Sequence, residues 1–242
     1  LDAKSGPVHS FFFWPFVGWR NGPSVTGWTA LWPLFSSTTM RDQFVLVNVL
    51  WPIYRYYHNK LEDNVTSWWI WPLFSRAVSD DQDSWTALWP IVWWQNYRDP
   101  DGTHSQQSVV PFFSRIAKDN NDGSKERHFK LWPLAHKTHE EDKDGNTVRG
   151  DWSLLSPLLG HKGLTYGLQE AYGFLWELAR GIQRTPDDSA LDILGRLYTH
   201  RSRSDGTTAS VPFLFNYEES ETGERTLRLF QFLSIPLGAG NR

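Results

Sequence analysis

The chain contains no cysteine and only one methionine among its 242 residues. Without cysteine, neither a disulfide framework nor a thiolate metal site is available. No apolar run approaches the length of a spanning helix, so we expect no helical membrane anchor. Because the chain begins at Leu1 rather than Met, removal of a leader before Leu1 stays open.

An excess of positive charge is also missing. The formal net charge is −3 with histidine neutral, which gives no electrostatic footprint for nucleic acid and no polybasic segment for anionic lipid. We therefore expect no nucleic-acid partner. Hydrophobic residues make up 40% and charged residues 21%, proportions typical of a folded protein rather than a disordered one.

Aromatic residues, in contrast, are abundant. The sequence holds 15 Trp, 15 Phe and 8 Tyr, which together make 16% of the chain. Tryptophan favours strands, interfaces and membrane–water boundaries, because its ring buries a large area while its N–H needs a hydrogen-bond partner. The composition therefore indicates a strand-rich protein with a contact surface.

An internal repeat runs through the chain. The stretch "TALWPLFSS" at 29–37 returns as "LWPIY" at 50–54, "IWPLF" at 70–74 and "ALWPIV" at 87–92. Aligning the motif proline, and two positions where another residue replaces it, gives twelve units of about 20 residues. We interpret residues 1–242 as a single repeat-built β domain. Its units are centred on Pro15, Pro33, Pro52, Pro72, Pro90, Pro111, Pro133, Pro157, Glu177, Arg196, Pro212 and Pro236.

Polar turn clusters separate the repeated motifs, for example "RDPDG" at 98–102 and "DKDGN" at 142–146. Asp-Gly in such clusters is a strong hairpin signal. One turn per unit leaves about 13–15 residues, enough for a strand of roughly 45 Å. The pattern predicts an all-β, antiparallel up-and-down meander of about twelve long strands. A parallel solenoid is the alternative, but the uneven spacing favours hairpins. Only 164–182 has a helical pattern, and the repeat claims its second half as a strand.

The motif proline sits where a strand would need a hydrogen-bond donor. Proline is confined in sheets to edges, strand starts and bulges, and eight internal prolines cannot all lie on edges. We therefore expect a row of prolines that creases the sheet. Both faces are apolar beside the crease, with Trp32 and Leu34 on one face and Leu31 and Phe35 on the other. Such a sheet would curl into a half-pipe, sandwich-like or barrel form.

The segment "HKTHEED" is the one candidate for a metal site. It offers His136, His139, Glu140, Glu141 and Asp142, and histidine with carboxylates can bind zinc. However, residues 136 and 139 of a strand face opposite sides, so a charged hairpin tip explains the segment better. The Asp-rich turns resemble fragments of calcium loops but lack the full ligand ladder and flanking helices. We expect no metal.

Signals of catalysis are absent from the sequence. The paired carboxylates Asp187–Asp188 and Glu218–Glu219 could serve acid–base chemistry, but both lie in turn-like polar segments. No nucleophile elbow occurs, and no glycine-rich phosphate loop precedes a helix. We predict a protein that is not an enzyme and has no catalytic residue and no cofactor.

The best binding candidates are three aromatic doublets. Adjacent strand residues face opposite ways, so one ring of each doublet points away from whatever the other packs on. An exposed ring could stack on sugars, lie at a lipid interface or anchor a protein partner; a thick core that needs both rings is the alternative. The candidate interaction surface consists of Tyr56, Tyr57, Trp68, Trp69, Trp93 and Trp94.

The repeated "LWPLF" and "LWPIY" segments with charged Asp-Gly turns resemble uncharacterised bacterial repeat proteins with tandem LWPLF/LFPLF motifs. The resemblance runs from Pro15 to Pro236. It implies a β-sheet protein of the bacterial cell envelope, in the periplasm or peripheral to the membrane, with no known activity.

These observations predict a structural or accessory subunit. It would dock through its aromatic sheet onto a protein assembly, with a membrane-associated respiratory or photosynthetic complex as one host and lipid contact as a further option. An outer-membrane β-barrel and a carbohydrate-binding module using exposed tryptophans are the alternatives.

Overall fold

The computed structural model describes residues 6–61, 64–158 and 164–239. The chain divides into two compact units, Leu1–Val110 and Pro111–Arg242, which we call unit 1 and unit 2. The expectation of one repeat-built domain over 1–242 stays a prediction.

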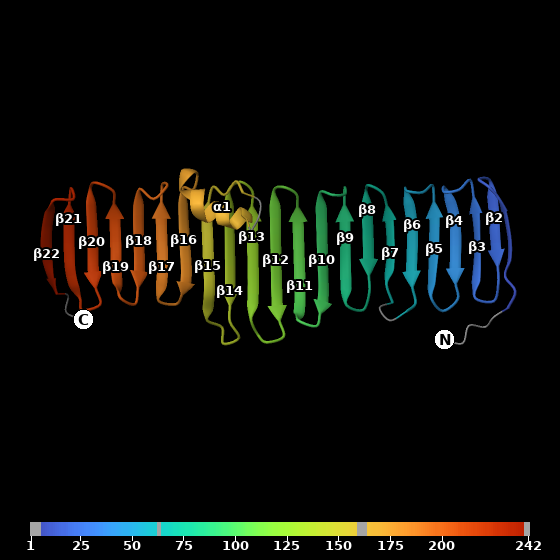
Figure 1. The fold of residues 1–242 in the computed structure, drawn as a ribbon, viewed down its shortest axis with the longest axis horizontal. Helices are drawn as coiled ribbons and strands as arrows, with labels where there is room; N and C mark the ends of the chain where they lie inside the picture. The colour runs from blue at the N-terminus through green and yellow to red at the C-terminus, as the bar shows by residue number, and fades with distance from the viewer. Residues whose placement is uncertain (1–5, 62–63, 159–163, 240–242) are drawn as a thin grey trace. The chain divides into compact units, whose positions relative to one another are not determined.

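Unit 1 is built of short β-strands (Figure 1). They are β1 (His9–Phe13), β2 (Val17–Asn21), β3 (Val25–Ala30), β4 (Phe35–Met40), β5 (Phe44–Val49), β6 (Tyr54–Asn59), β7 (Thr66–Ile70), β8 (Phe74–Val78), β9 (Gln82–Ala87), β10 (Val92–Asp99) and β11 (Gly102–Val109).

Unit 2 contains strands and one helical excursion. Its elements are β12 (Phe113–Asn120), β13 (Lys125–Leu131), β14 (Ala135–Glu141), β15 (Thr147–Leu154), α1 (Leu164–Tyr172), the 3-10 turn η1 (Gly173–Leu175), β16 (Ala179–Thr185), β17 (Asp188–Ile193), β18 (Tyr198–Arg203), β19 (Gly206–Val211), β20 (Phe215–Ser220), β21 (Glu224–Leu229) and β22 (Leu233–Ala239).

Within each unit, every strand pairs antiparallel with the next strand along the chain. The all-β, up-and-down meander expected from the sequence is therefore confirmed. In both units the meander is open rather than closed into a barrel.

The expected number of about twelve long strands and the proline crease are wrong, because the described residues form 22 shorter strands. The Trp-Pro motif forms the turn of a hairpin rather than the middle of a long strand. In "LWPL", the Leu34 N–H donates to the Leu31 carbonyl over 2.9 Å, and the Trp32–Pro33 bond is cis. A cis proline at the third position defines a type VI turn. Proline lacks an N–H and cannot continue a ladder, but this turn position needs no donor.

Three of the twelve repeat centres, Pro157, Glu177 and Pro236, do not lie in a hairpin turn. Pro157 and Glu177 both lie in the connection between β15 and β16 that contains α1. They therefore belong to one connecting segment and are not the centres of two strands. Arg196 lies in the β17–β18 turn as the alignment implies. Pro236 lies inside β22, and the turn before that strand is Phe230–Gln231–Phe232.

The alternation of turns gives each unit two different long edges. Turns that follow odd-numbered strands carry the tryptophan, proline and leucine residues, and we call this the hydrophobic turn edge. Turns that follow even-numbered strands carry aspartate, asparagine and glycine, as the sequence predicts. The Asp142 carboxylate, for example, accepts hydrogen bonds from the N–H groups of Asp144 and Asn146 over 2.9 and 2.8 Å. This local geometry explains the calcium-loop resemblance.

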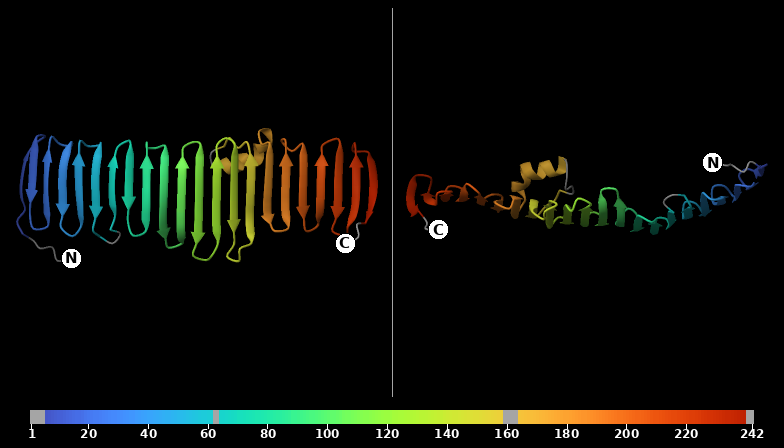
Figure 2. Two further views of the ribbon diagram at one scale, coloured as in Figure 1. Left: turned by 180° about the vertical axis from the view of Figure 1, so that it is seen from behind. Right: turned by 90° about the horizontal axis from the view of Figure 1, so that it is seen from below.

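The strands of each unit form one layer, which Figure 2 shows edge-on. Among the described residues, no hydrophobic side chain is fully buried, so neither unit has the core of a sandwich-like form. A sheet is ordinarily covered by a second sheet or by a full layer of helices. Neither is present among the described residues of the two units. No helix in the described part of the chain is long and apolar enough to cross a membrane.

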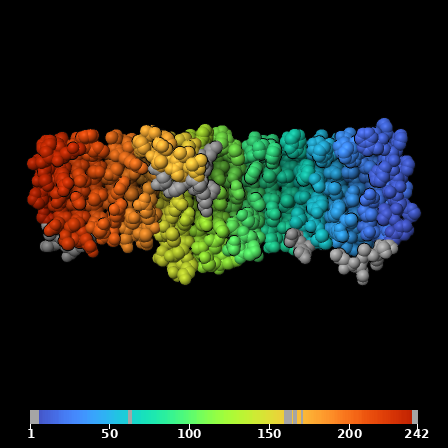
Figure 3. Space-filling view, in the orientation of Figure 1, coloured from blue at the N-terminus to red at the C-terminus, as the bar shows by residue number. Residues whose placement is uncertain are grey.

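Helix α1 is the one element that covers a sheet face in the described residues of unit 2. It lies over the strands near the hydrophobic turn edge (Figures 1 and 3). The helical pattern expected within 164–182 is confirmed in its first half, and the strand claimed by the repeat begins at Ala179.

Candidate docking surface

One face of unit 1 carries most of its strand aromatics. The register pairs Tyr56 with Trp68 and Trp85 with Trp94, and alternate residues of a strand share a face. We call this the aromatic face. Its aromatic members are Phe11, Phe13, Trp19, Trp28, Phe35, Tyr54, Tyr56, Trp68, Phe74, Trp85 and Trp94.

Four rings of the aromatic face form a ladder across β7 to β10. The ring centroids of Trp68 and Phe74 are 5.2 Å apart, those of Phe74 and Trp85 are 6.2 Å apart, and those of Trp85 and Trp94 are 5.9 Å apart. The last two pairs are stacked with interplanar angles of 13°. Such pairs stabilise by about 0.5–1.5 kcal/mol each beyond their buried area. The ladder therefore holds the four rings in place, and each ring remains at least partly exposed.

The opposite face of unit 1 is more polar. The Asn48 amide donates to the Ser36 hydroxyl over 2.8 Å, and the hydroxyls of Ser75 and Thr86 lie 2.7 Å apart. Small side chains and hydrogen bonds between strands replace the aromatic ladder on this face. Unit 1 is thus an amphipathic sheet whose aromatic side has no covering layer in the described residues.

The predicted interaction residues are divided between the two faces. Tyr56, Trp68 and Trp94 belong to the aromatic face, whereas their doublet neighbours lie on the opposite face, as the strand rule requires. Tyr56, Tyr57, Trp68 and Trp69 are half-buried by neighbouring side chains, while Trp93 and Trp94 are 39% and 38% exposed. The six residues therefore do not form one surface, and the ladder brings only Trp68 and Trp94 together.

Trp69 is tied down on its own face of the sheet. Its indole N–H donates to the Pro52 carbonyl over 3.3 Å, and the Arg55 guanidinium lies over its ring at 5.0 Å from the centroid. Such contacts fix a ring within the molecule. In this doublet, Trp68 on the aromatic face is therefore the better candidate for contact with a partner.

The hydrophobic turn edge adds a second apolar surface. Trp14 is 75% exposed and Phe232 is 86% exposed. Successive turns are joined through the backbone: the Trp32 N–H donates to the Pro15 carbonyl, and the Trp89 N–H donates to the Pro72 carbonyl, over 2.8 and 2.9 Å. Because the turn backbones satisfy one another, the side chains are free to project outward.

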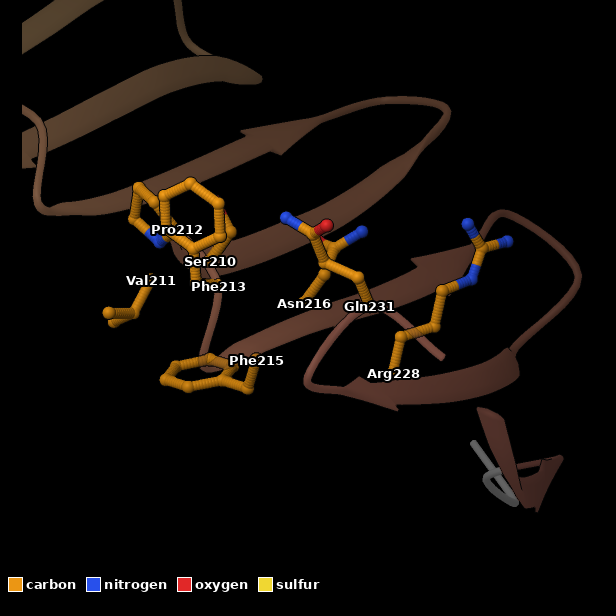
Figure 4. A pocket seen from close by; sticks show the side chains of 8 residues that line it. All are labelled: Ser210, Val211, Pro212, Phe213, Phe215, Asn216, Arg228 and Gln231. Atoms are coloured by element: carbon orange, nitrogen blue, oxygen red, sulfur yellow. The ribbon is translucent and has the colours of Figure 1, made fainter. Parts of the chain in front are cut away.

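A hollow of about 260 Å³ lies on this edge of unit 2, between the β19–β20 and β21–β22 turns. Figure 4 shows the Phe213 ring beside Pro212, with the amide ends of Asn216 and Gln231 lying between that ring and Arg228. The hollow is shallow and mixed in character, and no set of groups in it converges for catalysis.

Sequence reasoning missed a buried polar network beneath α1. It joins β13, β14, β15 and β16 to the helix and its connections. Its side chains are all buried, and they are Lys130, His136, Asp151, Ser153, Ser156, Gln169, Glu177 and Arg180. The members come from segments far apart in the chain, so no local sequence motif predicts that they meet. The alternation of polar residues on the strands was the only available signal.

Gln169 connects α1 to this network. Its amide nitrogen donates to the Ser153 hydroxyl over 3.4 Å and to a Glu177 carboxylate oxygen, and its oxygen accepts from Ser156 over 3.2 Å. The Ser153 hydroxyl also lies 3.0 Å from Nδ1 of His136. Gln169 therefore fastens the helix to the sheet by hydrogen bonds.

An ion pair and an ammonium group complete the network. Arg180 donates to the Asp151 carboxylate over 3.1 Å, and both side chains are almost fully buried. The Lys130 ammonium donates to the Ser156 hydroxyl over 3.1 Å and to the Leu158 carbonyl. Buried charges need such partners, because losing water costs each charge several kcal/mol.

Burial shifts two titratable groups of this network. Removal from water lowers the pKa of Lys130 to about 8. Burial also lowers the pKa of His136; the negative charge of Asp151 opposes this shift, and the positive charges of Lys130 and Arg180 add to it.

The network could be mistaken for a serine–lysine catalytic pair. However, Ser156 is 1% exposed and Lys130 is 4% exposed, so no substrate reaches them in this structure. Their role here is to hold α1 on the sheet.

The "HKTHEED" segment forms β14 and its following turn. His136 faces the buried network, whereas His139 lies on the other face with its Nε2 3.0 Å from the Glu141 carboxylate. The expected separation of the two histidines is thus confirmed. No group of three or more potential metal ligands comes together among the described residues.

Comparison with known proteins gives no family assignment. No protein-family model matches the chain, and no curated protein matches its sequence.

Proposed function

We propose that this protein is a non-enzymatic structural or accessory subunit that docks through its aromatic-rich β-sheet onto a protein assembly. One observation carries the proposal: no hydrophobic side chain is buried among the described residues, while tryptophans, phenylalanines and leucines are exposed throughout. A soluble monomer rarely exposes a contiguous apolar patch larger than a few hundred Å². A sheet with an apolar face is ordinarily stable only when that face is covered.

The total exposed surface supports the need for a partner. The chain exposes 16143 Å². Two separate compact domains of half its length would together expose roughly 13,000 Å². Covering apolar surface contributes about 25 cal/mol per Å², so burial of the aromatic face would supply a large part of the stability that an internal core normally provides.

The chemistry of the surface indicates an apolar protein partner. Aromatic rings, above all tryptophan and tyrosine, dominate the binding energy of protein interfaces, and the aromatic face presents a ladder of them across β7 to β10. The host we propose is a membrane-associated complex of the bacterial cell envelope, respiratory or photosynthetic, with the chain on its extracytoplasmic side. Lipid contact along the hydrophobic turn edge is compatible with this placement, since tryptophan favours membrane interfaces.

Two adjacent tryptophans give a matched test of the docking face. Trp94 lies on the aromatic face and Trp93 on the opposite face of the same strand, and their exposed fractions are nearly equal. We expect Trp94→Ala to weaken recovery of the native assembly, measured by native mass spectrometry of affinity-purified extracts. Trp93→Ala should leave it unchanged. A chain that is monomeric, protease-resistant and without a partner in its native extract would contradict the proposal.

A further inference from the structure

A row of alternating cations and aromatic rings crosses unit 2 on the face away from α1. The register places Arg115 on β12 opposite Phe129 on β13, Phe129 opposite Lys137 on β14, and Lys137 opposite Trp152 on β15. All four side chains are exposed. We call these four residues the cation–aromatic row.

The two cations of the row are uncompensated. Neither Arg115 nor Lys137 has a hydrogen bond or an ion pair with any described residue. Other charged side chains on this face are already paired, since Arg127 contacts Asp119 and His139 contacts Glu141. Neighbouring strands lie about 4.8 Å apart, so the two free cations, two strands apart, are separated by roughly 10 Å.

Two shallow hollows flank the row and share Lys137. One, of about 320 Å³, is lined by Arg115, Phe129 and Lys137 among others. The other, of about 420 Å³, is lined by Lys137, Trp152 and Gly181 among others. A Cβ atom added at Gly181 would lie 2.1 Å from Nε1 of Trp152, so the indole rests directly on the backbone of β16. The glycine fixes the ring in position and leaves its outer side open.

The underside of this platform is rigid. Ser153 on β15 and Arg180 on β16 point to the other face and belong to the buried network that α1 closes. Binding sites supported by locked neighbours keep their geometry better than sites on free loops. The strands that carry Phe129, Lys137 and Trp152 are therefore held in place from the other face, and the Trp152 ring is held against Gly181.

We propose that the cation–aromatic row binds an anionic polysaccharide in which acidic and neutral sugars alternate. The C–H face of a sugar ring stacks on an indole or phenyl ring. A carboxylate on every second sugar would lie over Arg115 and over Lys137, where charge-assisted hydrogen bonds form. The spacing of the two cations favours a polymer with a negative charge on every second sugar. Phe129 between them and Trp152 beyond Lys137 favour sugars over a bare anion.

This site is independent of the docking proposal, because the row lies in unit 2 and the aromatic face in unit 1. The test titrates the full chain with hyaluronan octasaccharide by isothermal calorimetry. A neutral chitin oligosaccharide and single-stranded oligothymidylate serve as comparison ligands. We expect hyaluronan to bind, the neutral oligosaccharide to bind at least tenfold more weakly, and added salt to reduce hyaluronan binding.

Substitutions at exposed positions keep the fold intact and test the contacts one at a time. Arg115→Gln and Lys137→Gln should each weaken hyaluronan binding by about tenfold, the effect of losing one charge-assisted contact. The matched control is Lys118→Gln, which removes a cation from the opposite face of the same strand as Arg115. Trp152→Phe should bind better than Trp152→Ala, with circular dichroism confirming the fold of both variants.

Four outcomes would overturn the proposal: no binding of hyaluronan, equal binding of the neutral oligosaccharide, equal binding of oligothymidylate, or a loss with Lys118→Gln as large as with Arg115→Gln. Oligothymidylate binding would assign the row to anions in general rather than to sugars. The co-purification results for Trp94 and Trp93 do not depend on any of these outcomes.

Discussion

Unit 1 and unit 2 are both antiparallel meanders of hairpins, but the faces of their sheets differ. Unit 1 carries a ladder of stacked rings on one face, and Ser108 is its only buried polar side chain among the described residues. Unit 2 covers part of one face with α1 and buries a network of charged and polar groups beneath it. The comparison teaches that a sheet without an apolar core can either hold a helix over part of one face or leave that face uncovered.

The sharpest test of this contrast is the buried ion pair in unit 2. Asp151→Ala removes the carboxylate beside the buried Arg180 guanidinium. Breaking one side of a buried pair costs about 3–5 kcal/mol. We expect hydrogen exchange to show that loss of stability in β15 and β16, with β1 to β10 unaffected.

Its control is an exposed ion pair in unit 1. Arg76 and Asp83 lie 3.4 Å apart with about half of each side chain exposed. Asp83→Ala should change stability by about 1 kcal/mol or less, since water screens exposed pairs. If Asp151→Ala and Asp83→Ala lower the stability by the same amount, the buried network does not stabilise unit 2 in the way that this comparison requires.

A smaller effect is expected where Trp152 rests on β16. Gly181→Ala places a methyl group against the indole, and overpacking of this kind costs about 1–3 kcal/mol. Urea unfolding followed by tryptophan fluorescence measures the loss.

Gly150→Ala is the matched substitution, because the nearest atom to its added Cβ would be Gln183 Cβ at an ordinary 3.4 Å. It should be nearly neutral. Equal effects at the two glycines would show that the indole does not rest on Gly181.

A further prediction concerns the pH dependence of stability. Burial lowers the pKa of Lys130 from 10.5 to about 8. Between these values the unfolded chain binds a proton that the folded chain does not, so the free energy of unfolding of unit 2 should rise with pH across that window. Below about pH 8 both states are protonated and this contribution is flat.

Lys130→Met should abolish the rise, and Lys137→Met, which removes an exposed lysine of the next strand, should keep it. Denaturation curves at several pH values between 7 and 11 would measure both. The same slope in Lys130→Met as in the unsubstituted chain would show that another group causes it.

The sequence predicted the all-β class, the antiparallel up-and-down order and the polar turns, because hairpin turns between successive strands have local signals. It failed at the motif, since Trp32 and Leu34 flank the proline with residues that usually belong inside a strand. Turns ordinarily use glycine, asparagine, aspartate and serine. The argument that proline cannot occupy a central strand was the correct signal, and it pointed to a turn rather than to a crease.

The candidate site was partly predictable for the same reason. Strand alternation correctly separated Trp93 from Trp94 onto opposite faces. It could not place Phe74 between Trp68 and Trp85, because that contact depends on which strands pair and in what register. The buried network was beyond local reasoning, since Lys130 meets Ser156 across 26 residues and Arg180 meets Asp151 across 29.

The central claim is that a partner covers the aromatic face of unit 1. Hydroxyl-radical footprinting of the native assembly, read out by mass spectrometry, tests it directly at Trp94 and Trp93. In the isolated chain both rings should be oxidised at similar rates, because they are equally exposed. In the assembly we expect Trp94 to be protected and Trp93 to stay reactive. Unchanged oxidation of Trp94, or protection of Trp93 alone, would contradict the claim.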